Sequence, residues 1–260
     1  MRSSPEVIEN ENAKARLARL LPDRPRWVET RGMLLSGRCE VLAASAPPPA
    51  SAPPEPDFLV LGSDFGLLCV AGRPAAEEIA RAVAHPVGRQ TLCMPEAAGE
   101  VGAALPGWSR RRFAVHSLRD GALREPAGSA EGVEVRMLSG RDASRLEHVP
   151  PALKDELETA LGFAHVAAAI VAGRPVSFCY ASYETETLWD VSIDTLEEHR
   201  RGGLASRCVA FLADHMARHG KDPVWGADAG NVASMRLAEA LGFEPVDELV
   251  VFERPAGAIR

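Results

Sequence analysis

Two arginines and two glycines occupy residues 200–203, directly before a stretch from Leu204 to Met216 with apolar residues three and four positions apart. That spacing predicts an amphipathic helix. The first amides of a helix have no intrahelical acceptor and carry partial positive charge, and glycines let the backbone come close to a ligand. The arginines add full charge at the same place. The sequence therefore predicts an anion site suited to phosphate oxygens, although a glycine turn can also be only a loop.

The segment before the turn, residues 188–195, alternates apolar and polar side chains and predicts a half-buried strand. Asp190, Ser192 and Asp194 share one of its faces, because successive strand residues point to opposite sides. A strand, a glycine turn and a helix are thus the elements expected to position the anion site, with acidic side chains nearby.

The turn resembles the Arg/Gln-x-x-Gly-x-Gly/Ala motif of the GNAT superfamily, the acetyl-CoA-dependent N-acetyltransferases. It reads Arg200, Arg201, Gly202, Gly203, Leu204, Ala205. A second segment, from Asn231 to Gly242 and Phe243, is similar to a later helix of the family. The resemblance covers about the last half of the chain, from near Val133 to near Phe252. A looser likeness to the zwittermicin-resistance-like branch of acetyltransferases does not settle the substrate.

The resemblance implies that acetyl-CoA is the cosubstrate and that the turn from Arg200 to Ala205 cradles its pyrophosphate. It also implies that the strand at Val191 and Ile193 lies beside the pantetheine arm, with further contacts from Asn231 and Ser234. Asn231 is equally well explained as the N-cap of a helix.

Acetyl transfer to an amine needs a base, because an alkyl amine with a pKa of about 10.4 is almost fully protonated at neutral pH. Candidates near the expected acceptor site are Asp190, Asp194, Glu184 and Glu186, with Asp190 first. A polar strand face or a solvated hairpin tip would explain each acid alone.

The leaving-group side departs from the family. Many members carry a tyrosine, as general acid, at the position of Ala238. The only tyrosines here are Tyr180 and Tyr183. Either could substitute from across the cleft; Tyr183 is the candidate, whereas core or cleft packing is the better expectation for Tyr180. Because a thiol has a pKa of about 8.5, coenzyme A is a tolerable leaving group without a protein acid.

The composition, 46% hydrophobic and 25% charged, is that of a soluble globular protein. The net charge of −7 disfavours a nucleic-acid partner, since phosphate binding needs a basic face. The five cysteines are an odd number without metal-ligand spacing, so we expect no metal and reduced thiols in the cytoplasm. The longest apolar run, Val166 to Ala172, is too short to span a membrane.

The organisation predicted is a domain over residues 1–130, with a proline-rich loop at 43–56, and an acetyltransferase domain over 131–260, separated by a turn-rich stretch at 125–132. In the first domain, residues 27–42 are predicted to form a pair of strands around Gly32 and Gly37.

The first half of the chain repeats the order of the second. A strand at 91–94, a helix at 95–105 and a strand at 112–118 parallel a strand at 223–227, a helix at 231–241 and a strand at 248–253. The first half lacks the Arg-x-x-Gly-x-Ala turn. We therefore expect a mixed α/β protein, with a GNAT fold in the C-terminal half and a smaller N-terminal lobe that is either degenerate and GNAT-like or a mixed α/β partner.

The function expected is acetyl-CoA-dependent transfer of an acetyl group to a primary amine of a small molecule, directly within a ternary complex. No cysteine has an evident histidine partner for an acyl-enzyme. An aminoglycoside-like antibiotic, a polyamine, an amino acid or a peptide amine would fit as acceptor, and a homodimer is compatible with the sequence. The alternative is a non-catalytic acyl-CoA-binding regulatory or interaction module, which the missing tyrosine and the large first lobe favour.

Overall fold

The structure is a computed structural model that describes residues 7–8, 11–43, 57–84, 90–119, 123–124 and 132–255 of the chain. Residues 44–56 of the expected proline-rich loop, and residues 125–131 of the expected boundary, lie outside the described part. No helix within these ranges is long and apolar enough to cross a membrane.

The chain forms two compact units, each built from segments that are discontinuous in sequence. Unit 1 comprises Met1–Val115, Asp228–Gly230 and Asp247–Arg260, and unit 2 comprises His116–Ala227 and Asn231–Val246. Three strands have residues in both units: β6 (Ser109–Leu118), β11 (Asp222–Asp228) and β12 (Phe243–Glu253). The division into domains at residues 130 and 131 stays a prediction.

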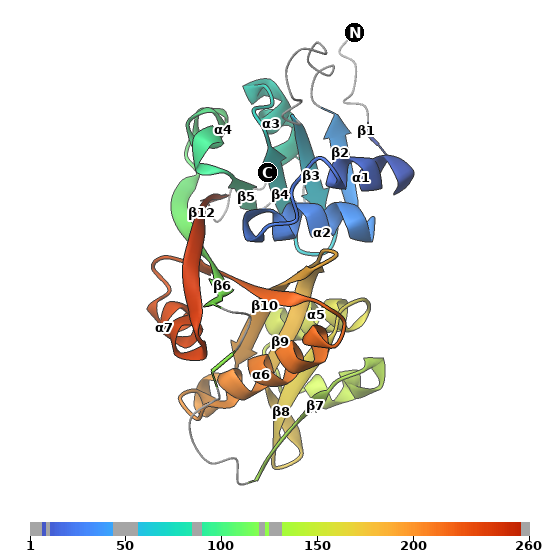
Figure 1. Cartoon of the computed structure of the whole chain (residues 1–260), viewed down its shortest axis with the longest axis vertical. Helices are drawn as coiled ribbons and strands as arrows, with labels where there is room; N and C mark the ends of the chain where they lie inside the picture. Colours follow the sequence, from blue (N-terminus) through green and yellow to red (C-terminus); the bar gives the residue numbers. More distant parts are fainter. Residues whose placement is uncertain are drawn as a thin grey trace. The chain divides into compact units, whose positions relative to one another are not determined.

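Unit 1 is a sheet covered by helices on both faces (Figure 1). Strands β1 to β4 pair antiparallel in order, β4 and β5 pair parallel, and the last residues of β12 pair antiparallel with β5. Its other elements in chain order are β1 (Val7–Ile8), α1 (Glu11–Ala18), η1 (Pro25–Trp27), α2 (Val28–Ser36), β2 (Cys39–Ala43), β3 (Phe58–Gly62), β4 (Leu67–Ala71), α3 (Ala76–Val83), β5 (Gln90–Cys93), η2 (Pro95–Ala97) and α4 (Ala98–Ala104).

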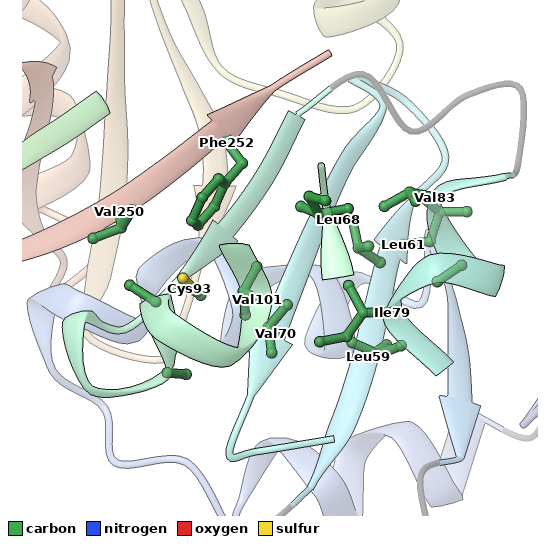
Figure 2. Packing of buried hydrophobic residues seen from close by; sticks show 14 residues of the cluster. Leu59, Leu61, Leu68, Val70, Ile79, Val83, Cys93, Val101, Val250 and Phe252 are labelled. Carbon is green, nitrogen blue, oxygen red and sulfur yellow. The ribbon is translucent and has the colours of Figure 1, made fainter. Parts of the chain in front are cut away.

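The core of unit 1 lies between the sheet and helices α3 and α4. Figure 2 shows side chains of β4 and β5, such as Val70 and Cys93, meeting Ile79 of α3 and Val101 of α4. Phe252 of β12 joins the same cluster. The last strand of the chain therefore completes the hydrophobic core of the first unit.

The expectation of two strands over residues 27–42 is wrong. Residues 28–36 form α2, which packs against β2, β3 and β4. Gly32 is buried inside the helix, and Gly37 ends it in the left-handed conformation with a φ of 71°. Burial of Val28, Met33 and Leu34 outweighs the unfavourable helix propensity of a central glycine, which is about 1 kcal/mol.

Unit 2 has its strands in the order β11, β10, β9, β8, β7, all antiparallel except for the parallel pair β10 and β11. Helix α6 crosses one face of β8, β9 and β10 (Figure 1). The elements are β7 (Val133–Met137), η4 (Gly140–Leu146), α5 (Pro151–Leu161), β8 (Val166–Val171), β9 (Arg174–Glu184), β10 (Leu188–Thr195), η5 (Glu197–His199), α6 (Leu204–Ala217), β11 (Asp222–Asp228) and α7 (Val232–Leu241). The mixed α/β class expected from the sequence is confirmed.

Candidate functional site

The predicted anion site lies between β10 and α6 in the structure. The strand ends at Thr195, and α6 begins at the buried Leu204 with Gly203 as its N-cap residue. Gly203 has a φ of 72°, and among the described residues no side-chain cap is formed at this helix start. The guanidinium of Arg200 donates through Nε to the carbonyl of Thr195 at 3.2 Å, which ties the turn to the strand.

Arg201 has a φ of 65°, one of two non-glycine residues with positive φ in the described chain. A left-handed conformation costs a residue with a Cβ on the order of 1–2 kcal/mol. Such strain is retained where the surrounding backbone imposes it, and it is frequent at ligand sites. Arg201 and Gly202 are both exposed, so the strained turn presents its cations and amides to solvent.

The parallel strands β10 and β11 separate beyond their first residues. Their pairing begins at Leu188 with Asp222 and ends at Asp190 with Val224, although β10 continues to Thr195. On its other side β10 stays paired with β9 down to Thr195. The backbone edge of Val191 and Ile193 that faces β11 is therefore left open. The two strands thus splay apart, and the opening between them leads from Asp190 towards the turn.

A polar cluster lies on the β9 and β10 face that carries Asp190. Ser182 bonds both the Ser192 hydroxyl and the Asp190 carboxyl. The hydroxyl of Tyr180, which is itself buried, donates to Glu156 of α5. Helix α5 therefore closes this face with a carboxylate.

Burial raises the pKa of two acids on this face. Burial raises the pKa of the Asp190 carboxyl to about 7, and the bond from Ser182 only partly opposes that change. Burial and then the neighbouring Glu156 carboxylate raise the pKa of Asp194 to about 6, while Arg200 opposes them. Burial and Glu156 also raise the pKa of Tyr180 well above its ordinary value, which keeps the phenol protonated. Two carboxyls with pKa values near neutrality can act as proton acceptors at physiological pH.

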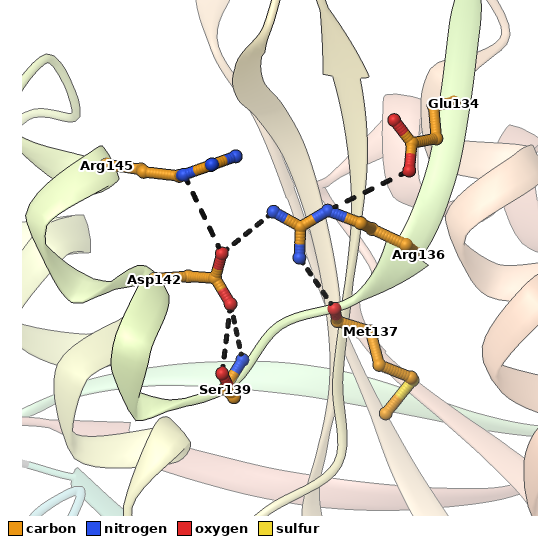
Figure 3. A network of polar contacts seen from close by, with 6 residues as sticks. All are labelled: Glu134, Arg136, Met137, Ser139, Asp142 and Arg145. Atoms are coloured by element: carbon orange, nitrogen blue, oxygen red, sulfur yellow. Dashed lines mark hydrogen bonds and ion pairs between the residues drawn. The ribbon is translucent and has the colours of Figure 1, made fainter.

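A partly exposed polar network lies at the start of η4, the element against which α5 packs (Figure 3). Arg136 of β7 donates to Asp142 at 2.8 Å, and the backbone N–H and hydroxyl of Ser139 donate to the same carboxylate at 3.0 and 3.1 Å. The hydrogen bond from Arg136 holds the pKa of Asp142 down to about 2. This network fixes η4, against which α5 packs, and so supports the placement of Glu156.

The remaining acids lie elsewhere. β9 has one extra residue relative to β10 between Ala181 and Glu184, because Val191 pairs with Ala181 and Trp189 with Glu184. This bulge puts Glu184 on the face of Trp189 and Val191, opposite the face of Asp190. Glu184 there accepts from Lys221 Nζ at 2.8 Å.

Glu186 is exposed in the hairpin between β9 and β10. Tyr183 is buried at the bulge. The structure therefore brings together Asp190 and Asp194 but neither glutamate. The catalytic roles of Asp190, Glu184, Glu186 and Tyr183 stay predictions.

Asn231 and Ser234 occupy the start of α7. The side chain of Asn231 accepts from Ser234 N–H at 3.2 Å, which is the N-cap geometry, and Trp225 Nε1 donates to the Ser234 hydroxyl at 3.1 Å. Asn231 is exposed, so its amide group can still reach a ligand. Ala238, in the position of the family's tyrosine, is fully buried and offers no acid.

Sequence reasoning missed Glu156, Ser182 and the bonding role of Tyr180. Glu156 lies among Lys154, Asp155 and Glu158, a pattern typical of a solvated helix face. Its contact with Tyr180 joins residues of two separate elements, α5 and β9, and no local sequence pattern predicts it. In the part of the chain that the structure describes, no group of three or more His, Cys, Asp or Glu side chains could hold a metal ion.

An arginine-bearing turn at an uncapped helix start, beside a parallel strand pair that separates, defines the class, a mixed α/β protein with a candidate anion site. Residues 152–252 match the sequence model of the family described as GNAT acetyltransferase. Through this segment, which spans less than half of the chain, the protein is similar to the GNAT acetyltransferases. No curated protein matches the sequence significantly.

Solved structures share the fold along almost the whole chain. A GCN5-related N-acetyltransferase-like protein from Streptococcus suis is 18% identical with a TM-score of 0.64, covering 94% of this chain and 100% of its own. A GCN5-related N-acetyltransferase from Kribbella flavida is 17% identical with a TM-score of 0.63, covering 95% and 97%. A tandem GNAT protein from the clavulanic acid biosynthesis pathway is 14% identical with a TM-score of 0.56, covering 99% and 100%. These TM-scores indicate a common fold, and the tandem protein fits the two-lobe description.

Proposed function

We propose that the protein is an acetyl-CoA-dependent N-acetyltransferase that moves an acetyl group to a primary amine of a small molecule, by direct transfer in a ternary complex. The observation that carries this proposal is the opening between β10 and β11. It begins at Asp190, a carboxyl with a pKa of about 7, and leads towards the uncapped start of α6. A proton acceptor thus stands at one end of the unpaired edge of β10 and an anion site at the other.

The residues present fit acetyl-CoA. Arg200, Arg201 and the free amides from Gly202 to Ala205 match the charge and geometry of a pyrophosphate. The open backbone edge at Val191 and Ile193 offers amide groups that pair with the amides of the pantetheine arm. Asn231 and Ser234 stand as further contacts by resemblance to the family. Bound acetyl-CoA supplies a thioester carbonyl that is open to attack by an amine.

Asp190 takes the proton of the acceptor amine. An aspartate of ordinary pKa, about 3.9, is a poor base for an ammonium of pKa about 10.4, and a pKa of about 7 shortens that difference by roughly three units. As the C–N bond forms and the C–S bond breaks, the thiolate leaves with a pKa of about 8.5 and needs no strong protein acid. Asp194, on the same strand face, and the neighbouring Glu156 add negative charge on this face and favour a cationic acceptor.

The alternative is a non-catalytic acyl-CoA-binding module. The buried Ala238 in place of the family's tyrosine favours it, and the engaged Tyr180 hydroxyl offers no direct replacement. Two carboxyls of raised pKa on the strand that borders the opening favour the enzyme. A cytoplasmic location is supported by five free, buried cysteines, which suit a reducing compartment. A homodimer and the absence of a nucleic-acid partner stay predictions.

The test is initial-rate kinetics against a broad panel of primary amines, following the released thiol with a chromogenic reagent. The five cysteines of the protein are buried, so the reagent responds to free coenzyme A. We expect turnover with at least one cationic amine and intersecting double-reciprocal lines, the pattern of a ternary complex. Parallel lines would contradict direct transfer. Tight acetyl-CoA binding without turnover of any amine would establish the binding module instead.

A further inference from the structure

Unit 1 contains a pocket of its own, of about 460 Å³, at the C-terminal ends of its parallel strands. Gly72 and Arg73 follow β4 and line one side, and Met94 follows β5. The connection between α1 and α2, which includes Leu21 and Trp27, forms the opposite wall. In open α/β sheets, ligands bind in the crevice beyond the carboxyl ends of parallel strands, so the location is that of a binding site.

The wall opposite the strands is held by buried hydrogen bonds. The guanidinium of Arg31, in α2, donates to the carbonyls of Ala18 and Leu21, and all three residues are buried. Lys14, also buried, donates to the carbonyls of Gly37 and Cys39 at 2.8 and 2.6 Å and ties α1 to the end of α2. The pocket is therefore preformed, which is what small-molecule sites require.

The lining combines an apolar surface with one opposite-charge pair. Leu21, Met94 and Ala97 are buried apolar side chains, and Trp27 is half-buried beside them. Arg26 and Glu96 supply the charges.

The charged pair is loosely made. Arg26 contacts Glu96 at 3.4 Å with side-chain exposures of 26% and 61%. The Arg26 Nε also lies 3.1 Å from Asp247 but makes no well-directed hydrogen bond, although it is buried. An exposed, long ion pair contributes little, so a ligand can replace it.

We propose that this pocket binds a small zwitterion with an apolar side group, of the α-amino-acid type. Its carboxylate meets the Arg26 guanidinium, its ammonium meets Glu96, and its side group lies against Trp27 and Met94. A ligand with only a carboxylate would set that charge beside Glu96, and one with only an amine would set it beside Arg26. The volume is at the small end of the range for ligand pockets, about 300–1,000 Å³.

The first test is calorimetry on the full chain with L-phenylalanine, L-leucine and L-tryptophan, compared with 3-phenylpropanoate and 2-phenylethylamine. We expect at least one amino acid to bind tenfold or more tightly than either singly charged analogue. Equal affinity for the three kinds of ligand, or no binding of any amino acid, would overturn the proposal.

Variants locate the site. Glu96→Gln should weaken amino-acid binding about tenfold while leaving 3-phenylpropanoate binding unchanged or stronger, and Glu77→Gln, on the exposed side of α3, serves as its control. Leu20→Trp should block the pocket from its rim, since Leu20 lines it and is 47% exposed. Leu35→Trp, at an equally apolar site with 37% exposure outside the lining, is the matched control. An effect in the controls, or none in the two pocket variants, would contradict the location.

Amino-acid binding in the pocket of unit 1 is independent of the proposed acetyl transfer in unit 2. If an amino acid instead bound at the acceptor site of unit 2, Asp190→Asn would weaken its binding and Leu20→Trp would not. We expect the reverse, with amino-acid affinity unchanged in Asp190→Asn and also unchanged by saturating acetyl-CoA.

Discussion

The two units contain the same series of elements, a strand, a turn, a helix and a parallel strand, but only one of the two parallel pairs is open. In unit 1, β4 and β5 pair from Leu67 with Gln90 to Val70 with Cys93, which covers the whole of β5. In unit 2, the pairing of β10 with β11 stops at Asp190 although β10 continues to Thr195. The same topology thus leaves free backbone amides in one unit and none between the paired strands of the other.

The N-termini of the two corresponding helices, α3 in unit 1 and α6 in unit 2, also differ in whether they are free for a ligand. In unit 1 the carboxylate of Glu78 accepts from Ala75 N–H at 3.0 Å, and Glu77 adds a second negative charge to the first turn of α3. In unit 2 the start of α6 carries two arginines, two glycines and no acid in its first turn. An acid at a helix N-terminus is stabilising but repels a phosphate. A few residues at the start of the helix therefore decide whether its first amides are capped by the protein or are available to an anionic ligand.

The largest effect we expect comes from the base. Asp190→Asn keeps the shape of the side chain and removes its charge, so turnover should fall by about a hundredfold with acetyl-CoA affinity unchanged. In the wild type, kcat/KM should rise with pH up to about 7, the pKa of Asp190, and this limb should vanish in the variant. Glu184→Gln is the control, because the bulge in β9 puts Glu184 on the other face. A normal rate in Asp190→Asn would move the role to Asp194 or water.

The second largest effect is expected at the anion site of unit 2. Gly203→Glu should weaken acetyl-CoA binding tenfold or more, and Arg201→Ala about tenfold, since a charge-assisted hydrogen bond contributes about 1.5–3 kcal/mol. Gly203→Ala separates charge from strain, because a Cβ is strained at a φ of 72° whatever its charge. Arg73→Ala, in the corresponding turn of unit 1, should change nothing. Equal losses at Arg73 and Arg201, measured by calorimetry, would contradict the difference between the units.

A smaller effect concerns stability. Asp142→Ala should lower the free energy of unfolding by about 2 kcal/mol at neutral pH, because three donors lose their acceptor. Asp64→Ala, which breaks the more exposed Arg38–Asp64 pair of unit 1, should cost about 0–1 kcal/mol.

The pH dependence of the Asp142 effect has a definite sign. The folded-state pKa of Asp142 lies near 2, below its ordinary value of 3.8, so its contribution is present above pH 3.8 and is lost as pH falls towards 2. Chemical denaturation at pH 7 and pH 3 measures the difference. An Asp142→Ala effect that grows with acidity would contradict the network.

The smallest effect lies in the histidine cluster of unit 2. Burial lowers the pKa of His215, and the neighbouring His165, His219 and Arg218 lower it further. Glu184 has the opposite effect and raises it. The unfolded chain therefore binds a proton before the folded one does, and stability falls as pH drops through about 6.5. The wild type should lose free energy of unfolding between pH 7.5 and pH 5.5. In His215→Gln this loss should be smaller by a few tenths of a kcal/mol. His199→Gln is the control, and an equal change in both variants, measured by urea unfolding, would contradict the assignment.

The features that the sequence alone predicts correctly are local ones. The alternation over residues 188–195 predicts β10 with its bounds, the glycines and arginines predict the uncapped start of α6, and Asn231 predicts the N-cap of α7. These features depend on side-chain period, on backbone freedom at glycine and on one hydrogen bond between near neighbours, all of which are written in consecutive residues.

Tertiary structure alone decided which acids share a face, where the helices close the sheet and what unit 1 can bind. One extra residue in β9 moves Glu184 away from Asp190, and the packing of α5 brings Glu156 to Tyr180 from 24 residues away. Burial turned the expected strands at 27–42 into α2, whose connection to α1 walls the pocket of unit 1. Each of these outcomes depends on contacts between residues far apart in the chain, whose free energy exceeds the local preferences that a sequence pattern reports.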